Sequence, residues 1–434
     1  MDFELHPEAI RAIDERSTIL IRKITELRIP PQSKDGFPSE RPIAATFTDK
    51  DIIGDPTIWA NDENGHRVLA FIFRNGVSFG LTEASFEFVK QISNQILKVR
   101  WARDCLSRKF IEESIIKWCK SEFEKPTISS LSEYIIPESK NSIRRFTIWA
   151  PIAHLEVEAS FAVGPTRIEP ITSAMFHELE SKGIESSPIQ AEQIKRLFKK
   201  LRSEMQGYAA VVLEFEAEPG YAYERGLSVA NDVVGLLRFF SNASYIPTLL
   251  CPNALLGSEY LPQSQAILLG TEGSFSAQYS LMPKNVAYWR LSKADVKKLE
   301  SEGLKEISKL VIEEGLGQFE RRVRTSVLAF GKGITFPDIA DRLVYTLSSL
   351  EGLLLKNESE PIQQNLGERM AFLLSKDPAT RMKIVELVRE AYRMRSQYIH
   401  HRISISEENE LQSFAVYARA SISIALKNMA LRAF

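Results

Sequence analysis

A run of leucines at helical spacing constrains the C-terminal part of the chain more than any other feature. In the segment IADRLVYTLSSLEGLLLK, the intervals are four, three and four between Leu343, Leu347, Leu350 and Leu354. These intervals place the side chains on one face of an α-helix, a pattern typical of a helix that packs in a bundle. The preceding tripeptide Phe-Pro-Asp at 336–338 predicts the start of this helix, with Pro337 near its first turn.

Strand signals largely stop at about Leu291, and the rest of the chain has helical periodicity. Residues 291–335 predict connecting helices. Three further helices are indicated by NLGERMAFLL, RMKIVELVREAYRMRSQYIHH and LQSFAVYARASISIALKNM. We therefore expect residues 336–434 to form an all-α bundle of about four or five helices.

Residues 1–290 predict a mixed α/β region, so the expected fold class is α+β. The first helix is predicted from PEAIRAIDERSTILIRKITELRI, ahead of Pro30. The runs RVLAFIFR and VSFGL flank Asn75-Gly76, a strong signal for a β-hairpin because both residues tolerate positive φ. Further strands are expected at RFTIWAPI, HLEVEASFAV and AAVVLEFEA, and further helices at QAEQIKRLFKKLRSEM and YERGLSVANDVVGLLRFF.

The composition limits the class of partner. The 434 residues include 55 Lys and Arg against 56 Asp and Glu, which argues against bulk electrostatic binding of nucleic acid but leaves room for a local basic site. We find no signal-peptide pattern in MDFELHPEAI and no apolar run long enough for a spanning helix. The scattered Cys105, Cys119 and Cys251 are typical of reduced, buried thiols. We expect a cytoplasmic protein with no membrane partner.

Common catalytic and cofactor motifs are absent from the sequence. It contains no GxxxxGK[ST], HExxH, CxxC or GxSxG, and the glycines at 270–273 and 331–333 are interpreted as turns. No metal ligands cluster around His6, His66, His154 or His177, so we predict no metal and no other cofactor. We interpret two basic runs, KRLFKKLR (Lys195, Lys199, Arg202) and FERRVR (Arg321, Arg322, Arg324), as solvated helix faces. The alternative is that they guide an anionic partner.

The segment RMRSQYIHHR at 393–402 is the strongest candidate site. On a helix, Ser396 and His400 share a face, whereas Arg395 and His400 diverge by about 140°. An imidazole can exchange protons near neutral pH, and a guanidinium can hold a phosphate, so these residue types suit metal-free RNA cleavage. The alternative is a helix surface on which Arg395 pairs with a carboxylate such as Glu390, with His400 and His401 solvated.

Three segments resemble, in order and spacing, the ApeA-like branch of HEPN domains (higher eukaryotes and prokaryotes nucleotide-binding). The first is LSSLEGLLLK with Glu351, and the second is LGERMAFLL with Arg369. The third, YRMRSQYIHH, supplies Tyr392, Arg395, Ser396, Ile399 and His400. The resemblance covers residues 336–430. It departs from the family pattern at His401, where glycine is common.

This resemblance implies a metal-independent endoribonuclease that works as a homodimer through its HEPN bundle. Two Arg-polar-x3–5-His motifs would face each other across one composite cleft. Arg395 would bind and stabilise the scissile phosphate, Ser396 would orient the phosphate or the histidine, and His400 would be the acid/base. Because His401 follows directly, the choice between the two imidazoles stays open. Arg393, His401 and Arg402 are expected to contact the RNA.

The resemblance also implies a role in bacterial anti-phage or abortive-infection defence. Residues 1–290 would then sense a phage-derived or nucleotide trigger, restrain the toxic nuclease or shape the RNA site. A non-enzymatic HEPN module that dimerises or binds nucleotides or RNA is the alternative. A toxin silenced by modification is less favoured, because the tyrosine typical two residues after the histidine is Arg402 here.

Overall fold

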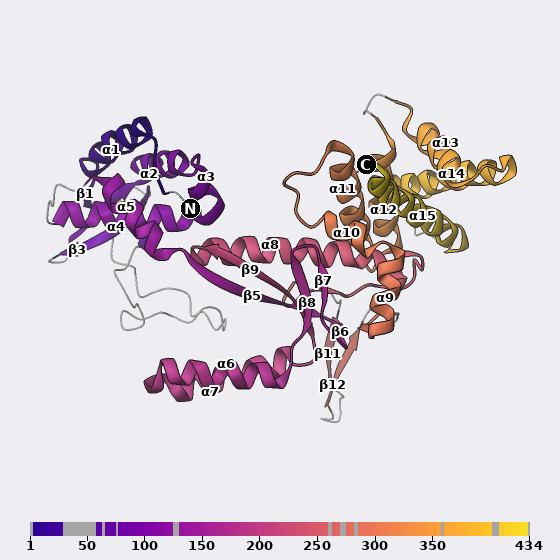
Figure 1. Ribbon diagram of the computed structural model, residues 1–434, viewed down its shortest axis with the longest axis horizontal. Coiled ribbons are helices and arrows are strands. Elements are labelled where there is room, and N and C mark those ends of the chain that lie inside the picture. Colours follow the sequence, from indigo (N-terminus) through magenta and orange to yellow (C-terminus); the bar gives the residue numbers. More distant parts are fainter. Residues whose placement is uncertain are drawn as a thin grey trace. The chain divides into compact units, whose positions relative to one another are not determined.

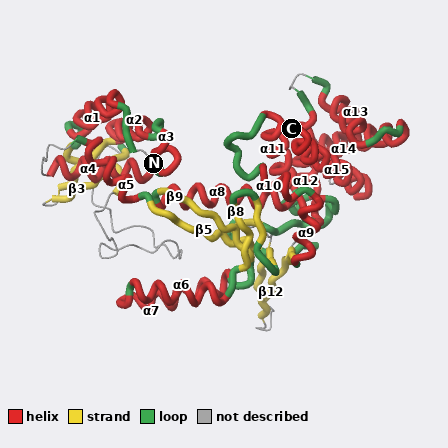
Figure 2. Tube along the Cα trace, in the orientation of Figure 1, coloured by secondary structure: helices red, strands yellow, loops and turns green. Residues whose placement is uncertain are grey.

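The structure is a computed structural model that describes residues 3–28, 58–62, 66–74, 77–124, 130–258, 263–269, 275–281, 285–356, 360–401 and 408–432. Helices predominate, and short strands form small sheets in the N-terminal two thirds of the chain (Figures 1 and 2). The expected α+β class is therefore confirmed. The chain divides into two compact units, which we call unit 1 (residues 1–146 and 215–224) and unit 2 (residues 147–214 and 225–434).

Unit 1 contains an antiparallel sheet with helices packed against it. The strand order is β1-β4-β3-β2, from β1 (Thr25–Leu27), β2 (Ile58–Asn61), β3 (Arg67–Arg74) and β4 (Val77–Thr82). Its helices are α1 (Pro7–Ile21), α2 (Glu83–Ile96), α3 (Arg100–Cys105), α4 (Arg108–Glu124) and α5 (Leu131–Ser142). A buried core including Ile13, Phe71, Val89 and Ile115 joins the helices to the sheet. Unit 1 thus has an apolar core of its own.

The predicted hairpin and first helix of unit 1 have different outcomes. β3 and β4 pair antiparallel up to Arg74 opposite Val77, as the hairpin prediction requires, while Asn75 and Gly76 themselves lie outside the described residues. The first helix was predicted too long, because it ends at Ile21 and Thr25–Leu27 form β1. The backbone of β1 forms antiparallel hydrogen bonds with β4. Local periodicity does not reveal such a distant partner, so the sequence pattern extended the helix too far.

A second sheet has the strand order β10-β5-β9-β8-β7. It is built from β5 (Arg144–Ala153), β7 (Phe161–Val163), β8 (Thr166–Pro170), β9 (Ala209–Ala217) and β10 (Ala254–Leu255). Two smaller pairs join β13 (Trp289–Leu291) to β6 (Leu155–Val157) in parallel, and β11 (Gln263–Leu269) to β12 (Phe275–Leu281). The glycines at 270–273 lie outside the described residues.

Helices α6, α7 and α8 accompany this second sheet. α6 (Ser173–Ser186) and α7 (Ala191–Met205) form a helical hairpin (Figure 1). Phe176 and Phe198 at its base pack against buried Ile171 and Val212. α8 spans Pro219–Leu237, and the 3-10 turns η2 (Arg238–Phe240) and η3 (Asn242–Ser244) follow it. The helices predicted from QAEQIKRLFKKLRSEM and YERGLSVANDVVGLLRFF are therefore present, whereas α6 was not foreseen.

The C-terminal part of unit 2 is a helical bundle. Its members are α9 (Lys293–Glu302), α10 (Leu304–Lys309), α11 (Gln318–Gly333), α12 (Ile339–Leu354), α13 (Ile362–Leu374), α14 (Pro378–His401) and α15 (Glu408–Arg432). α15 packs against every helix from α10 to α14. The predicted connecting helices α10 and α11 therefore belong to the same packed body as the later ones, and the division at residues 290 and 335 stays a prediction.

The leucine stripe of α12 faces the core as predicted. Leu343, Leu347 and Leu350 are buried, and Leu354 is half-buried. The helix starts where the sequence indicated, because Asp338 is its N-cap and accepts a 2.7 Å hydrogen bond from the Ala340 amide. Pro337 directly precedes the cap, next to the first turn as predicted.

A buried arginine fixes α12 against η3 and the loop that follows it. Arg342 is only 6% exposed and donates hydrogen bonds to the carbonyl oxygens of Ala243 and Leu249, each at 2.8 Å, and to that of Pro247. Burial lowers the pKa of Arg342 to about 10 because the guanidinium charge has left water. Three carbonyl acceptors offset that cost and orient the helix that carries the leucine stripe.

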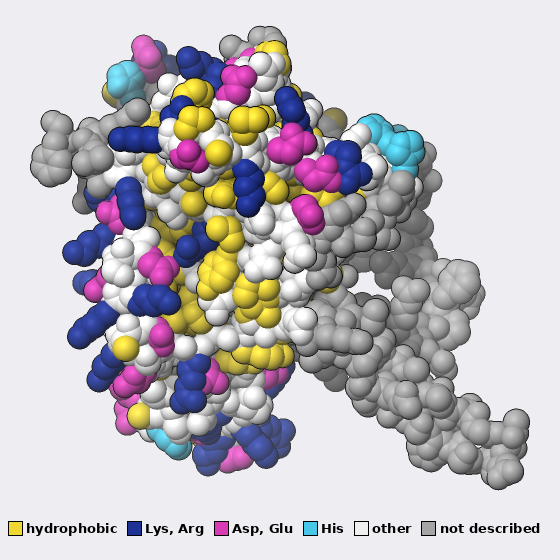
Figure 3. All heavy atoms as spheres, turned by 90° about the vertical axis from the view of Figure 1, so that its right-hand side faces the viewer, with side chains coloured by type: hydrophobic (Ala, Val, Ile, Leu, Met, Phe, Trp, Pro, Cys, Tyr) yellow, Lys and Arg dark blue, Asp and Glu magenta, His cyan; other side chains and the backbone are white. Residues whose placement is uncertain are grey.

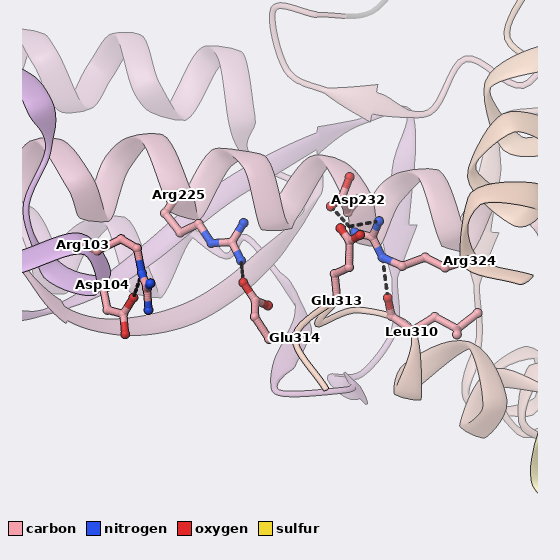
Figure 4. Close-up of polar contacts among 8 residues, drawn as sticks. All are labelled: Arg103, Asp104, Arg225, Asp232, Leu310, Glu313, Glu314 and Arg324. Carbon is pink, nitrogen blue, oxygen red and sulfur yellow. Dashed lines mark hydrogen bonds and ion pairs between the residues drawn. The ribbon is translucent and has the colours of Figure 1, made fainter. Parts of the chain in front are cut away.

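A second arginine ties α11 to α8, which corrects the prediction of a solvated face at Arg324, whereas Arg321 in the same run is exposed as predicted. The Arg324 side chain is 11% exposed and pairs with Asp232 at 2.5 Å, while its Nε donates to the Leu310 carbonyl at 2.9 Å (Figure 4). The more exposed Arg225–Glu314 pair lies on the same side of α8 at 2.9 Å (Figure 4). Periodicity alone could not show that Arg324 points inward, because its partners come from distant segments.

Replacing Arg324 by Met will loosen the attachment of α11 to α8. We expect the local free energy of opening to fall by about 2 kcal/mol, because Asp232 then loses its partner in a largely covered position. Amide hydrogen exchange in α8 and α11, read by mass spectrometry, measures this change.

Arg225→Met is the matched control, since its exposed pair should contribute less than about 1 kcal/mol. Equal exchange rates in the two variants would contradict the role assigned to Arg324.

Candidate functional site

The predicted motif occupies the last two turns of α14, which runs antiparallel to α12. The Tyr392 hydroxyl donates a 2.6 Å hydrogen bond to Glu351 near the end of α12. Six residues later, Tyr398 donates at 3.3 Å to Asp341 in the first turn of α12. These two contacts fix the relative position of α12 and α14, so residues between them are held by both helices.

Glu351 joins two of the motif residues. Its carboxylate accepts the hydrogen bond from Tyr392 and lies 3.6 Å from Nη1 of Arg395. The Arg395 side chain is 32% exposed, while its Nε is buried and has no hydrogen-bond partner. The structure thus brings together Glu351, Tyr392 and Arg395, three of the residues on which the family resemblance was based.

The remaining motif residues lie on the solvent side of α14. Ser396, His400 and His401 are all exposed, and the two imidazole rings are 6.4 Å apart at 60°. Among the described contacts, none joins Arg395 to Ser396 or His400. One copy of the chain therefore anchors the arginine and presents the histidine, without closing them around a common cleft.

The neighbouring basic residues differ in their surroundings. Arg393 forms hydrogen bonds with Glu390 at 2.8 Å and 2.9 Å and with Gln397 at 2.8 Å. The alternative, in which Arg395 pairs with a helix carboxylate while His400 and His401 are solvated, agrees with the structure except that the carboxylate is Glu351 of α12. Glu390 instead pairs with Arg393. Arg402 lies outside the described residues.

Arg369, from the second segment of the resemblance, has a structural position. Its guanidinium forms two hydrogen bonds to Glu360, at 2.9 Å and 2.6 Å, and Nη1 also donates to the Leu354 carbonyl at 2.8 Å. It thereby satisfies an acceptor at the C-terminal end of α12 and ties α13 to it. This arrangement stabilises the helix that carries Glu351.

The environment of Tyr392 strongly favours the protonated, neutral phenol over the phenolate. Burial raises the pKa of the Tyr392 phenol, the hydrogen bond to Glu351 raises it further, and so does the Glu351 charge. Arg395 acts in the opposite direction. The phenol therefore remains a neutral hydrogen-bond donor, which keeps Glu351 in place beside the Arg395 guanidinium.

Chemically, this arrangement combines a positioned cation with exposed proton-exchanging groups. A guanidinium held by a carboxylate can hydrogen-bond to phosphate oxygens in a fixed orientation. Exposed imidazoles can donate or accept protons near neutral pH. Within the residues that the structure describes, no group of three or more His, Cys, Asp or Glu side chains is arranged to hold a metal ion.

The contact between Tyr398 and Asp341 was missed from the sequence. Its only signal was a tyrosine within the motif and an acidic residue in the first turn of α12, and nothing in the spacing joined them.

No helix in the described part of the chain is long and apolar enough to cross a membrane. Comparison with family models, with curated proteins and with solved structures found no match for this chain.

The pKa of Tyr392 gives a test of the Glu351 contact. Subtracting the alkaline ultraviolet titration of Tyr392→Phe from that of the wild type should reveal a phenol that ionises above the ordinary tyrosine range of about 10. Because the folded pKa is raised, this phenol contributes stability that is full below the unfolded pKa and is lost as pH rises through the folded one.

In Glu351→Gln the same difference titration should give a lower pKa for Tyr392. This pKa should still lie above the ordinary tyrosine value, since burial is the largest cause of the shift. A Tyr392 phenol that titrates with its ordinary pKa in the wild type would contradict the contact.

Proposed function

We propose that this chain is an ApeA-like HEPN endoribonuclease that cleaves RNA without a metal ion and acts as a cytoplasmic homodimer. The observation that carries the proposal is the anchored Arg395. Its guanidinium is held by Glu351, and Ser396 and His400 follow on exposed turns of the same helix. The residue types, their order and the contact with Glu351 all fit a site for phosphate and for proton transfer.

The roles proposed for Arg395, Ser396 and His400 are those that the resemblance implies, whereas the role of Glu351 follows from its contacts. Arg395 binds the scissile phosphate and offsets charge that develops on it during cleavage. His400 takes the proton of the 2′-hydroxyl or gives one to the leaving oxygen, and Ser396 orients the phosphate or the imidazole. Glu351 does not touch the substrate. It positions Arg395 and is therefore a positioning residue.

The Nε of Arg395 has no hydrogen-bond acceptor in a single chain, which supports the proposal that a binding partner supplies one. A buried donor without an acceptor is rare in folded proteins and costs about 1–3 kcal/mol. Because this Nε is covered, an RNA phosphate or a second copy of the chain supplies the acceptor once the guanidinium turns outward from α12. The donor set of Arg395 is thus better satisfied in an assembled complex than in one chain.

Two features support a dimer through the bundle. Arg395 faces α12 while His400 faces solvent, so a cleft with both groups needs a second motif opposite. Large apolar side chains are also exposed on the three last helices, at Ile362, Phe372, Met382, Ile399 and Val416. Figure 3 shows one face of the molecule on which hydrophobic side chains lie among interspersed basic and acidic ones.

The structure of unit 1 supports the proposal that it acts as a separate sensing or restraining domain. It has its own apolar core around Ile13, Phe71 and Ile115, so it needs no part of the bundle to bury its helices. We assign it the recognition of a phage-derived or nucleotide trigger in an abortive-infection response. Cys105, Cys119 and Cys251 are buried and form no disulfide, which suits the reducing cytoplasm.

The proposal is tested by cleavage of single-stranded and structured RNA in EDTA. Arg395→Ala and His400→Ala should each lower the rate at least about a hundredfold, because each removes an interaction made in the transition state. Arg389→Ala is the control, since it removes an exposed guanidinium from the same helix and should leave the rate unchanged. His401→Ala decides between the two imidazoles, and we expect it to retain most of the activity.

Cleavage that persists unchanged in both Arg395→Ala and His400→Ala would reject the assignment. Specific RNA or nucleotide binding without cleavage, with or without infected-cell extract as a source of trigger, would favour the non-enzymatic HEPN module.

The dimer has its own test. Light scattering coupled to size exclusion should give the wild type about twice the chain mass of 49.2 kDa. The double variant Phe372→Asp with Met382→Asp should be monomeric, because it puts charge on two side chains that are 66% and 74% exposed.

Leu197→Asp on α7 is the matched control, since Leu197 is also exposed but lies outside the bundle. A wild type that is monomeric at micromolar concentration would contradict the proposed assembly.

A further inference from the structure

His154 has an unusual backbone conformation. It lies between β5 and β6 with φ of 61°, and it is the one non-glycine residue with positive φ in the described ranges. Its carbonyl oxygen accepts hydrogen bonds from Asn253 Nδ2 at 2.8 Å and from the Trp289 amide at 3.1 Å. Such a conformation persists where surrounding contacts enforce it, and enforced strain often marks a functional position.

The strained backbone places the imidazole in a cluster of aromatic rings. The His154 ring lies 5.2 Å from the ring of Tyr288 and 6.2 Å from that of Tyr208, at interplanar angles of 58° and 59°. The three rings come from separate segments of unit 2: the β5–β6 turn, the residues after α7 and those before β13. A cluster assembled from three segments is set by the fold and not by local sequence.

Burial does not explain the outer ring of this cluster. Tyr288 is 59% exposed, so most of its ring surface faces solvent although His154 packs against it. Among the described contacts, neither tyrosine hydroxyl has a hydrogen-bond partner. Tyr288 therefore offers an open aromatic surface, with the half-buried rings of His154 and Tyr208 beside it.

A positive charge lies close to Tyr288 in the sequence. Arg290 is two residues from Tyr288, and its side chain is 86% exposed. Its partner Glu156 is 3.5 Å away and is itself 55% exposed, so solvent screens the pair and the guanidinium can exchange this carboxylate for another anion. An open aromatic surface next to an available guanidinium is the combination that binds unpaired bases and their phosphates.

We propose that Tyr288, His154 and Tyr208 form a platform on which unpaired bases of single-stranded RNA stack, with Arg290 on an adjacent phosphate. The inference rests on the proposed nuclease function and adds a substrate-binding surface outside the motif of α14. It specifies single-stranded RNA as the substrate class, because the bases of a duplex are paired and do not expose their faces for stacking.

The test measures binding separately from cleavage. The full chain carrying His400→Ala is titrated in EDTA against a fluorescein-labelled oligouridine of about twelve nucleotides, and affinity is read by anisotropy. Adding Tyr288→Ala should weaken binding about tenfold, whereas Tyr288→Phe should retain it because the ring remains. A duplex RNA of equal length should respond to neither change.

Three further variants sharpen the result. Tyr223→Ala is the matched control, since Tyr223 on α8 is 64% exposed but outside the cluster, and affinity should not change. His154→Gly removes the imidazole from a backbone that glycine adopts easily, and affinity should fall. Arg290→Gln should reduce the slope of log affinity against log salt concentration by about one, the value expected for the loss of one phosphate contact.

Equal affinities for Tyr288→Ala and Tyr223→Ala would overturn the platform, as would a full chain that does not bind the oligouridine. These failures differ from failure of the nuclease assignment. If Arg395 and His400 are needed for cleavage while Tyr288→Ala binds normally, only the platform is lost. If Tyr288→Ala weakens binding while cleavage does not depend on Arg395, only the nuclease assignment is lost.

Discussion

The Glu351 carboxylate is the contact on which the candidate site depends. It accepts a hydrogen bond from the half-buried Tyr392 and faces the Arg395 guanidinium, so α12 and α14 position the arginine jointly. Burial keeps Tyr392 protonated and therefore a donor, which prevents the carboxylate from turning away. Without this carboxylate, Arg395 would be one more flexible side chain on a helix surface, with the entropy cost of ordering it still to be met when a phosphate binds.

The carboxylate can do this because α12 is itself fixed from two directions. Its leucine stripe packs in the bundle, and Arg342 donates to one carbonyl oxygen in η3 and to two in the loop that follows it. Arg324 then ties the neighbouring α11 to α8. Buried arginines of this kind cost desolvation energy and are retained where they specify one arrangement of elements. Here that arrangement determines where the end of α14 can lie, and so where Arg395 and His400 are presented.

Much of this could be predicted from the sequence, and the limits have physical causes. The leucine spacing identified α12 and its buried face, because helix period and burial act within one segment. Glu351, Tyr392 and Arg395 were singled out by resemblance, and the structure brings them together. Local patterns could not show that Arg324 is covered, that α1 ends at Ile21 or that His154 is strained. Each of these depends on partners distant in the sequence: Asp232, β4 and Asn253.

The central claim is that Arg395 and His400 act on the same phosphate. The measurement that tests it most directly is a crystal structure of the assembled protein with a single-stranded RNA whose 2′-hydroxyls are methylated, so that it binds without being cleaved. We predict one phosphate within hydrogen-bond distance of the Arg395 guanidinium and of a His400 imidazole, with the motifs of two chains facing each other. RNA bound away from α14, or two motifs on opposite sides of the assembly, would contradict the account.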